Sequence, residues 1–429
     1  MKRANESRLR ICFVSLFCYP LFNPSSTGQF GGSEVRVAQI ARNLARVKAF
    51  DVSVLVFDHG QSHIEVIDDI AIYSWRERPA PSLHDLTQMR SLSIVFQGLL
   101  KMERLGERLR RVLRGGMNKW RARVLPVERG IPYLIDVRPL AVYDEIDADV
   151  YVLPGNSVYS AELAYYCSRT AARYVFLAGS DMDYDPDYKA HPRRRDIYGS
   201  LYALKAYAIE HADHHVVQNH HQAELLRRYY GRDSTLIRNP IDLQPRFPRD
   251  PAPRSILWVG KSDERVKQPS VVVRLARQLP AYEFTMVMPM TVRETHEQIL
   301  AAAEQLPNLT IVEGVPFDQI EAYFARARLH INTSRFEGFP NTFLQAAKYG
   351  VPTLSLRVDP DGMLSRHGCG TACEGDMNRM RAEIIRYMED DALCDQVGER
   401  ALHYVRKYHD MEVIIPQYIA LFETLLAAD

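Results

Sequence analysis

The residues with the clearest chemical potential lie at positions 334–350. Glu337 follows an apolar run and is succeeded by Gly-Phe-Pro-Asn at 338–341. Pro340 is suited to the first turn of a helix, whose free backbone N–H groups would then face a ligand. Such an arrangement can bind a sugar hydroxyl through Glu337, phosphate through the backbone N–H groups, and a diol through Gln345, about one turn into the helix.

Two lysines follow another apolar run. Gly260 and Lys261 end this run, and Lys267 comes six residues later. A P-loop would need an earlier glycine where Ser255 stands, so we reject that motif. Two cations at the edge of a cleft could clamp a diphosphate. Two solvated lysines are the alternative, and the lysines by themselves favour it.

A glycine-rich turn lies near the amino terminus, at 28–34. Gly31 and Gly32 would let the backbone approach a ligand at the start of a helix. The spacing differs from Gly-x-Gly-x-x-Gly, so it does not support a dinucleotide fingerprint. A plain tight turn explains the same residues equally well.

Two polar clusters are weak candidates for metal sites. Asp181 and Asp183 form an Asp-x-Asp motif, whose carboxylates are ligands that hard divalent cations favour, but the surrounding pattern does not match a metal-binding fold. A group of histidines straddles two expected helices and a strand, whereas zinc needs convergent ligands. They are His211, His214, His215, His220 and His221. We therefore expect no bound metal.

The elements that position these residues alternate between strands and helices. Expected strands of the first half lie at 11–17, 52–57, 150–153, 174–177 and 215–217, and those of the second half at 255–260, 282–288, 309–312, 327–332 and 352–356. Residues 239–255 contain five prolines and predict a linker. This alternation predicts an α/β protein with two doubly wound parallel sheets, whose ligands bind beyond the carboxyl ends of the strands. The basic start and the apolar run at 11–22 also resemble a short signal peptide, but Pro20 interrupts the run, so we favour a strand.

Composition excludes several classes of protein. The 429 residues are 46% hydrophobic and 25% charged, which is typical of a globular chain and not of a disordered one. Because 54 basic residues face 53 acidic ones, no overall field attracts nucleic acid, and we expect no nucleic-acid partner. Six cysteines are too few for a disulfide scaffold and favour a reduced, cytoplasmic chain.

One segment, residues 84–125, interrupts the alternation of strands and helices. Nine basic residues lie between Lys101 and Arg123, and apolar residues such as Leu105 and Leu109 share the opposite arc of a helical wheel. One hypothesis is a basic amphipathic helix that contacts an anionic membrane surface. The alternative is a helix packed on the core with a solvated basic face.

Taken together, these motifs resemble the signature of glycosyltransferase family 4, the retaining, nucleotide-sugar-dependent enzymes of the GT-B fold. The Glu-Gly-Phe at 337–339 and the Gly-Val-Pro at 350–352 resemble the family's signature, and Lys261 and Lys267 resemble its Gly-Arg…Lys pair. The run at 238–242 resembles the family's hinge. These likenesses extend from about residue 11 to 376, but 84–125 matches nothing specific.

The resemblance implies two Rossmann-like domains that face a central cleft. Residues 1–250 would bind the acceptor, residues 251–411 the nucleotide sugar, and a final helix at 412–429 would cross back to the first domain. The catalytic residues would be Glu337, Lys261 and Lys267. The donor-binding residues would be Gly31, Gly32, Gly260, Phe339, Pro340, Asn341, Thr342 and Gln345.

The resemblance also implies the reaction and the partners. A UDP- or GDP-linked sugar would be the donor, a glycan or lipid-linked hydroxyl would be the acceptor, and no cofactor or metal would be needed. Glycan, lipopolysaccharide or glycolipid assembly is the expected setting, with a cytoplasmic location that includes the inner face of the membrane.

Three departures from the family pattern leave alternatives open. Gln345 replaces the second glutamate, Lys261 replaces an arginine, and the stretch 178–181 lacks a histidine that family members often carry. A catalytically impaired binding protein and a GT-B epimerase or phosphorylase are therefore the alternatives.

Overall fold

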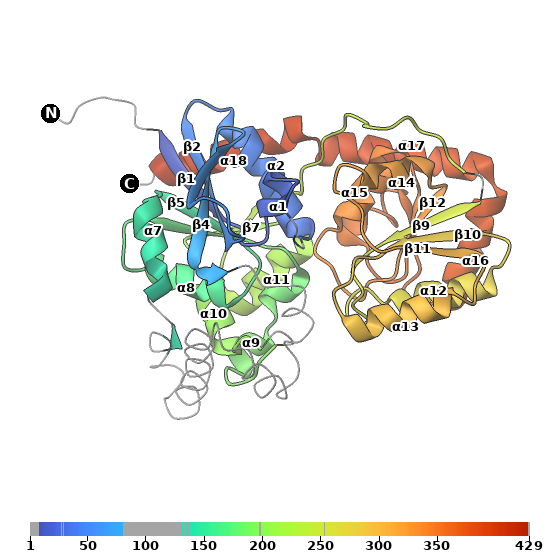
Figure 1. Ribbon diagram of the computed structural model, residues 1–429, viewed down its shortest axis with the longest axis horizontal. Coiled ribbons are helices and arrows are strands. Elements are labelled where there is room, and N and C mark those ends of the chain that lie inside the picture. The colour runs from blue at the N-terminus through green and yellow to red at the C-terminus, as the bar shows by residue number, and fades with distance from the viewer. Residues whose placement is uncertain are drawn as a thin grey trace.

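A computed structural model describes residues 8–427, apart from positions 27, 29, 80–130, 132–133, 136–137, 197–198 and 253. The chain forms two α/β lobes, with the final helix lying against the first of them (Figure 1). The basic segment 84–125 falls outside the described residues, so its membrane contact stays a prediction. In the part of the chain that the structure describes, no helix has both the length and the apolar character needed to cross a membrane.

The first lobe is built on an eight-stranded sheet. Its strands, in spatial order, are β3 (Ile64–Ile67), β4 (Ile70–Pro79), β2 (Phe50–Asp58), β1 (Leu9–Val14), β5 (Val150–Pro154), β6 (Arg173–Leu177), β7 (His214–Val217) and β8 (Thr235–Leu236). All neighbouring strands run parallel except β3 and β4. The apolar run near the amino terminus is thus the central strand β1, as predicted, although it ends at Val14 rather than Phe17.

The second lobe holds a six-stranded parallel sheet. Its strands, in spatial order, are β11 (Leu309–Val312), β10 (Glu283–Val287), β9 (Ser255–Val259), β12 (Leu329–Asn332), β13 (Thr353–Ser355) and β14 (Gly370–Ala372). No sheet strand lies between Leu236 and Ser255 among the described residues of that interval, which include most of the predicted linker.

Helices cover both sheets. In the first lobe they are α1 (Tyr19–Phe22), α2 (Gly32–Ala45), α7 (Ala141–Ile146), α8 (Val158–Cys167), α9 (Asp187–Ala190), α10 (Tyr202–Glu210) and α11 (His220–Tyr230). The later ones are α12 (Pro269–Gln278), α13 (Arg293–Ala303), α14 (Ile320–Arg326), α15 (Asn341–Lys348), α16 (Met377–Glu389), α17 (Asp391–Tyr408) and α18 (Met411–Ala427). Short 3₁₀ turns occur at Arg138–Leu140, Asp181–Tyr184 and Pro360–Gly362.

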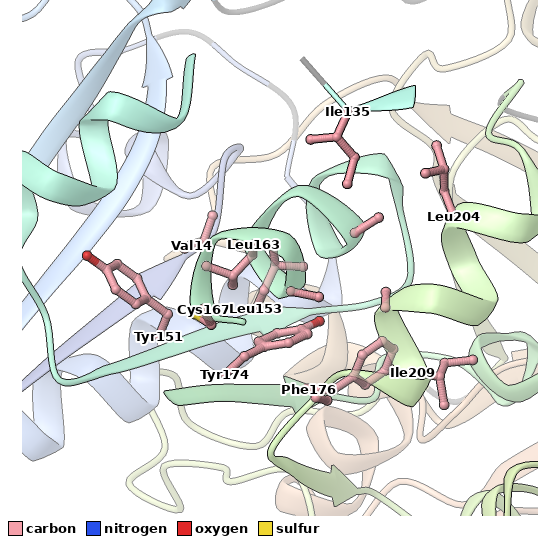
Figure 2. Packing of buried hydrophobic residues seen from close by; sticks show 14 of the residues in the cluster. Val14, Ile135, Tyr151, Leu153, Leu163, Cys167, Tyr174, Phe176, Leu204 and Ile209 are labelled. Carbon is pink, nitrogen blue, oxygen red and sulfur yellow. The ribbon is translucent and has the colours of Figure 1, made fainter. Parts of the chain in front are cut away.

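The central strands of the first sheet are buried on both faces. Tyr151 and Leu153 of β5 point to the face covered by α8 and α10 and belong to the same hydrophobic cluster as Leu163 and Leu204 (Figure 2). Val152 of the same strand points to the opposite face, which is covered by α2 and α18. Because successive side chains of a strand alternate between faces, a parallel strand buried on both sides is apolar throughout.

The last helix, α18, belongs to the core of the first lobe. Tyr418 and Phe422 pack in the same cluster as Val37 of α2. Arg36, which is 1% exposed, donates hydrogen bonds to Tyr418 Oη at 2.8 Å, to Ala178 O at 2.8 Å and to Ile237 O at 3.1 Å. This buried guanidinium ties the end of the chain to the end of β6 and to the segment that leaves the first lobe.

Candidate active site between the two lobes

The amino ends of two helices, one from each lobe, meet at this site. Asn341, the first residue of α15, donates a hydrogen bond from Nδ2 to the carbonyl oxygen of Gly32 at 2.9 Å, and Gly32 is the first residue of α2. A Cβ atom on Gly32 would lie 3.2 Å from Asn341 Nδ2, so a larger residue would crowd this contact. Pro340 caps α15 rather than occupying its first turn, a one-residue difference from the expectation. Two positive helix ends side by side favour an anion.

Lys261 reaches the same place from the end of β9. A Cβ atom on Gly31 would lie only 3.3 Å from Lys261 Nζ, so the lysine extends toward the amino-terminal loop. Gly260 has a separate structural reason to be glycine, because a Cβ there would come within 2.8 Å of the Trp258 ring. The structure therefore brings together Gly31, Gly32, Lys261 and Asn341, which are far apart in the sequence.

Lys267 and Glu337 form an ion pair that the sequence did not reveal. Ser334 Oγ donates a second hydrogen bond to Glu337 Oε1 at 2.7 Å. The Lys267 and Glu337 side chains are 24% and 16% exposed, so water screens this pair only partly. Lys267 was expected beside the diphosphate and Glu337 beside the sugar. Their pairing means that a diphosphate would share Lys267 with Glu337.

The remaining expected donor-binding residues differ in their surroundings. Thr342 and Gln345 are half-buried on α15. Phe339 is buried in the core, with its ring centroid 4.5 Å from that of His409, and its N–H donates to Gln218 Oε1 at 2.8 Å. Phe339 therefore anchors the loop that carries Glu337, and its side chain does not face the surface.

Gly338 allows the two lobes to touch. Its carbonyl oxygen accepts a hydrogen bond from Asn219 Nδ2 at 3.0 Å. A Cβ atom at this position would lie 2.3 Å from Gln218 Oε1 and 2.8 Å from the carbonyl oxygen of Gly179, both in the first lobe. The glycine of the Glu-Gly-Phe run is thus required by a close approach between lobes.

The hinge adds further contacts between the lobes. Asn239 Nδ2 donates to Phe339 O at 3.0 Å and to Asn341 Oδ1 at 2.9 Å. Arg238 and the His220 N–H both bind the Asp361 carboxylate. Although burial opposes ionisation of this carboxyl group, these two donors hold its pKa below the usual value. The segment that leaves the first lobe therefore contacts the loops that carry the site.

Asp181 is a site residue that sequence reasoning considered only as a metal ligand. It lines a cavity of about 220 Å³ together with Glu337 and Gly338. Burial raises its pKa to about 6, against the opposing effects of hydrogen bonds from Asn219 and Gln222. Asp181 follows the expected strand at 174–177, and ligands bind beyond the carboxyl ends of parallel strands. This position is the feature of the sequence that could have identified Asp181 as a site residue.

The second aspartate of the motif, Asp183, has a structural role. Its carboxylate accepts hydrogen bonds from the N–H groups of Gly179 at 2.7 Å, Ser180 at 2.9 Å and Asn156 at 3.0 Å. These bonds fold the loop that presents Asp181. No group of three His, Cys, Asp or Glu residues arranged for a metal ion occurs within the described ranges.

Chelation is a direct test of the Asp-x-Asp motif. We expect sugar transfer to continue in EDTA, because the Asp183 carboxylate is already committed to three N–H groups and is not available to a divalent cation. The measurement is the transfer rate with EDTA and with added Mg²⁺ or Mn²⁺. A rate abolished by EDTA and restored by Mn²⁺ would make Asp181 and Asp183 a metal site after all.

Comparison with known proteins supports the resemblance. Residues 253–390 match the family model described as glycosyl transferases group 1. Over 128 residues the chain is 30% identical to the N-acetyl-alpha-D-glucosaminyl L-malate synthase of Bacillus anthracis, a segment that covers 28% of this chain and 34% of that protein. The sequence match therefore spans about a third of the relative's length.

Solved structures extend the likeness to nearly the whole chain. Sucrose-phosphate synthase from Thermosynechococcus elongatus superimposes with a TM-score of 0.72 and 18% identity, covering 98% of this chain and 100% of that one. HepE from Anabaena, solved in complex with UDP and glucose, gives a TM-score of 0.61 and 14% identity, with 97% and 100% coverage. Because both sequence identities are low, these two structures show a similarity in fold alone. Residues 253–390 thus match the glycosyl transferases group 1 family, and the fold of the chain as a whole is GT-B.

Proposed function

We propose that this protein is a retaining glycosyltransferase that moves a sugar from a nucleotide-sugar donor to a hydroxyl acceptor. The observation that carries the proposal is the convergence of Lys261, the Lys267–Glu337 pair and the amino end of α15 where the two lobes meet. Cations and a helix amino end suit a diphosphate, and a carboxylate beside them suits a sugar hydroxyl. Glycan, lipopolysaccharide or glycolipid assembly is the proposed setting.

The proposed mechanism relies on charge stabilisation and positioning. The acceptor oxygen attacks the anomeric carbon on the face that the diphosphate leaves, so the new glycosidic bond keeps the original configuration. The bond from the anomeric carbon to the phosphate oxygen breaks, and the departing diphosphate takes the acceptor's proton. Lys261, Lys267 and the N–H groups of α15 would stabilise the charge that develops on the diphosphate. Glu337 would hold a hydroxyl of the transferred sugar and orient Lys267.

UDP-linked sugars are the first donors to test. HepE, whose fold resembles this one, was solved with UDP and glucose, and this supports a UDP-linked donor without identifying it. GDP-linked sugars are the second group. A thermal-shift screen of both groups would identify the donor, since a ligand at about 100 times its Kd adds ~2.7 kcal/mol to the free energy of unfolding.

Two alternatives predict different outcomes with the same donor. An impaired family member, suggested by Gln345, would bind a nucleotide sugar without turnover. A GT-B epimerase or phosphorylase would convert the donor without joining its sugar to an alcohol. Assays of donor hydrolysis, epimerisation and transfer, run on one identified donor, distinguish all three.

Lys261→Ala tests the proposed diphosphate site. We expect donor use to fall about 10-fold, because a charge-assisted hydrogen bond contributes ~1.5–3 kcal/mol, reduced here by partial exposure. The protein should fold, since Lys261 is not part of the core. The measurement is kcat/KM for the donor. The control is Lys189→Ala, which removes a surface lysine paired with Glu210. Wild-type kcat/KM in Lys261→Ala would refute the assignment.

A further inference from the structure

The cavity beside Glu337 has a distinctive set of charges. About 220 Å³ in volume, it is lined by side chains from both lobes, including Asp181 and His221 from the first and Arg335, Glu337 and Arg357 from the second. It is smaller than the roughly 300–1,000 Å³ of pockets for drug-sized ligands. Its size therefore suits a small acid or one part of a sugar.

Most carboxylates of this cavity are already engaged. The pairs are Glu337 with Lys267 and Ser334, Asp359 with the N–H groups of Leu364 and Ser365, and Asp361 with Arg238 and the His220 N–H. Lys267 and Arg238 offset the charges of Glu337 and Asp361, and backbone N–H groups donate hydrogen bonds to Asp359. They leave little negative charge directed into the cavity.

The arginines of the cavity have no carboxylate partner among the described residues, although Arg335 Nε lies 3.2 Å from the side-chain amide of Gln268. Within the described ranges, neither Arg335 nor Arg357 forms an ion pair. Arg357 lies over Gly375, where a Cβ atom would come within 2.6 Å of its Nη1, so the glycine makes room for the guanidinium. Arg335 is held at its backbone, where its N–H donates to Val266 O at 2.9 Å. Both side chains are exposed and available to a ligand.

We propose that Arg335 and Arg357, with His221 across the cavity, bind an anionic group of the acceptor. Guanidinium groups match the geometry of carboxylates and phosphates, so either group fits. Because Glu337 lines the same cavity, an acceptor held there would lie beside the proposed donor sugar. This inference rests on the proposed function and narrows its acceptor to an acidic or phosphorylated molecule.

Substitution of Asp181 tests whether the ligand of this cavity carries a negative charge. Its Oδ1 accepts hydrogen bonds from Asn219 and Gln222, and it faces the same cavity. Its negative charge opposes an anion at Arg335 and Arg357. Asp181→Asn should therefore bind an anionic ligand more tightly, whereas a variant that merely disturbed the fold would bind it more weakly.

The experiment uses calorimetry on the full chain with three probes: glucuronate, glucose 6-phosphate and glucose. Titrations run with and without UDP, because UDP blocks the diphosphate site that could otherwise take the phosphate. We expect the wild type to prefer one or both anionic probes over glucose by about 10-fold or more. Arg335→Ala and Arg357→Ala should each remove most of that preference, and Arg335→Lys should retain part of it. Arg293→Ala, an exposed arginine paired with Glu297, is the matched control.

The outcomes separate this inference from the proposed function. A preference for glucuronate alone identifies a carboxylate site, and one for glucose 6-phosphate alone identifies a phosphate site. Equal affinity for all three probes, or a preference that survives in the Arg335→Ala/Arg357→Ala double variant, overturns the inference. Transfer from a nucleotide sugar to neutral acceptors only would also overturn it and leave the proposed function standing. Anion binding without any nucleotide-sugar binding would overturn the proposed function and leave only an anion site at these arginines, not an acceptor site.

Discussion

Glu337→Gln is expected to lower turnover about 100-fold while leaving donor affinity less affected. The carboxylate would lose its charge beside the breaking bond, where positive charge develops on the sugar, and Lys267 would lose its counter-charge in a partly buried position. Loss of a charge-assisted hydrogen bond is worth ~1.5–3 kcal/mol, and ~1.4 kcal/mol is tenfold in rate. The measurement is kcat and donor KM with one identified donor.

Gln345→Ala is the matched comparison for this variant. Gln345 lies half-buried on α15, and we propose that it binds only the ribose diol of the donor. We expect its loss to weaken donor binding by a neutral hydrogen bond, ~0.5–1.5 kcal/mol, and to leave turnover nearly unchanged. Gln345→Glu should preserve or tighten donor binding. A larger loss of turnover in Gln345→Ala than in Glu337→Gln would show that the two roles are reversed.

Gly338→Ala is expected to reduce transfer about 10- to 100-fold and to loosen the contact between the lobes. The added Cβ would meet Gln218 Oε1 at 2.3 Å and the backbone oxygen of Gly179 at 2.8 Å, and backbone yields less easily than a side chain. Overpacking of this kind destabilises by ~1–3 kcal/mol. Because the strain falls on the contact that joins the Glu337 loop to the first lobe, we expect the lobes to separate before either unfolds. Small-angle scattering would report a larger radius of gyration, and calorimetry a lower Tm.

Gly314→Ala is the control for this change. A Cβ atom at Gly314 would have no neighbour within 4 Å, and the residue lies in the same lobe. It should match the wild type in Tm and radius of gyration. If Gly338→Ala also matched the wild type in transfer and shape, the closed contact between the lobes would not be the active arrangement.

The alternating elements could be predicted from the sequence because their signal is local. Strands buried on both faces are continuously apolar, and the helix-spaced apolar residues Val37, Ile40, Ala41 and Leu44 of α2 are fully buried. The hairpin of β3 and β4 was missed, since its turn is Asp68-Asp69, at φ of 55° and 62°, rather than a pair containing glycine. Aspartate tolerates that conformation less often than glycine does, so the sequence pattern is weak there.

The sequence by itself determined the residue types of the site: a carboxylate, two lysines and a helix start beyond strand ends. Only the tertiary structure decided how they meet. The pairing of Lys267 with Glu337, the approach of Lys261 to Gly31, and the entry of Asp181 from the other lobe all join segments tens to hundreds of residues apart. The sequence likewise could not predict that Arg335 and Arg357 lack a carboxylate partner among the described residues, because this depends on which neighbouring acids bind other groups. Such contacts follow from how two sheets and the loops beyond their strands pack together, and the local periodicity of the sequence does not predict that packing.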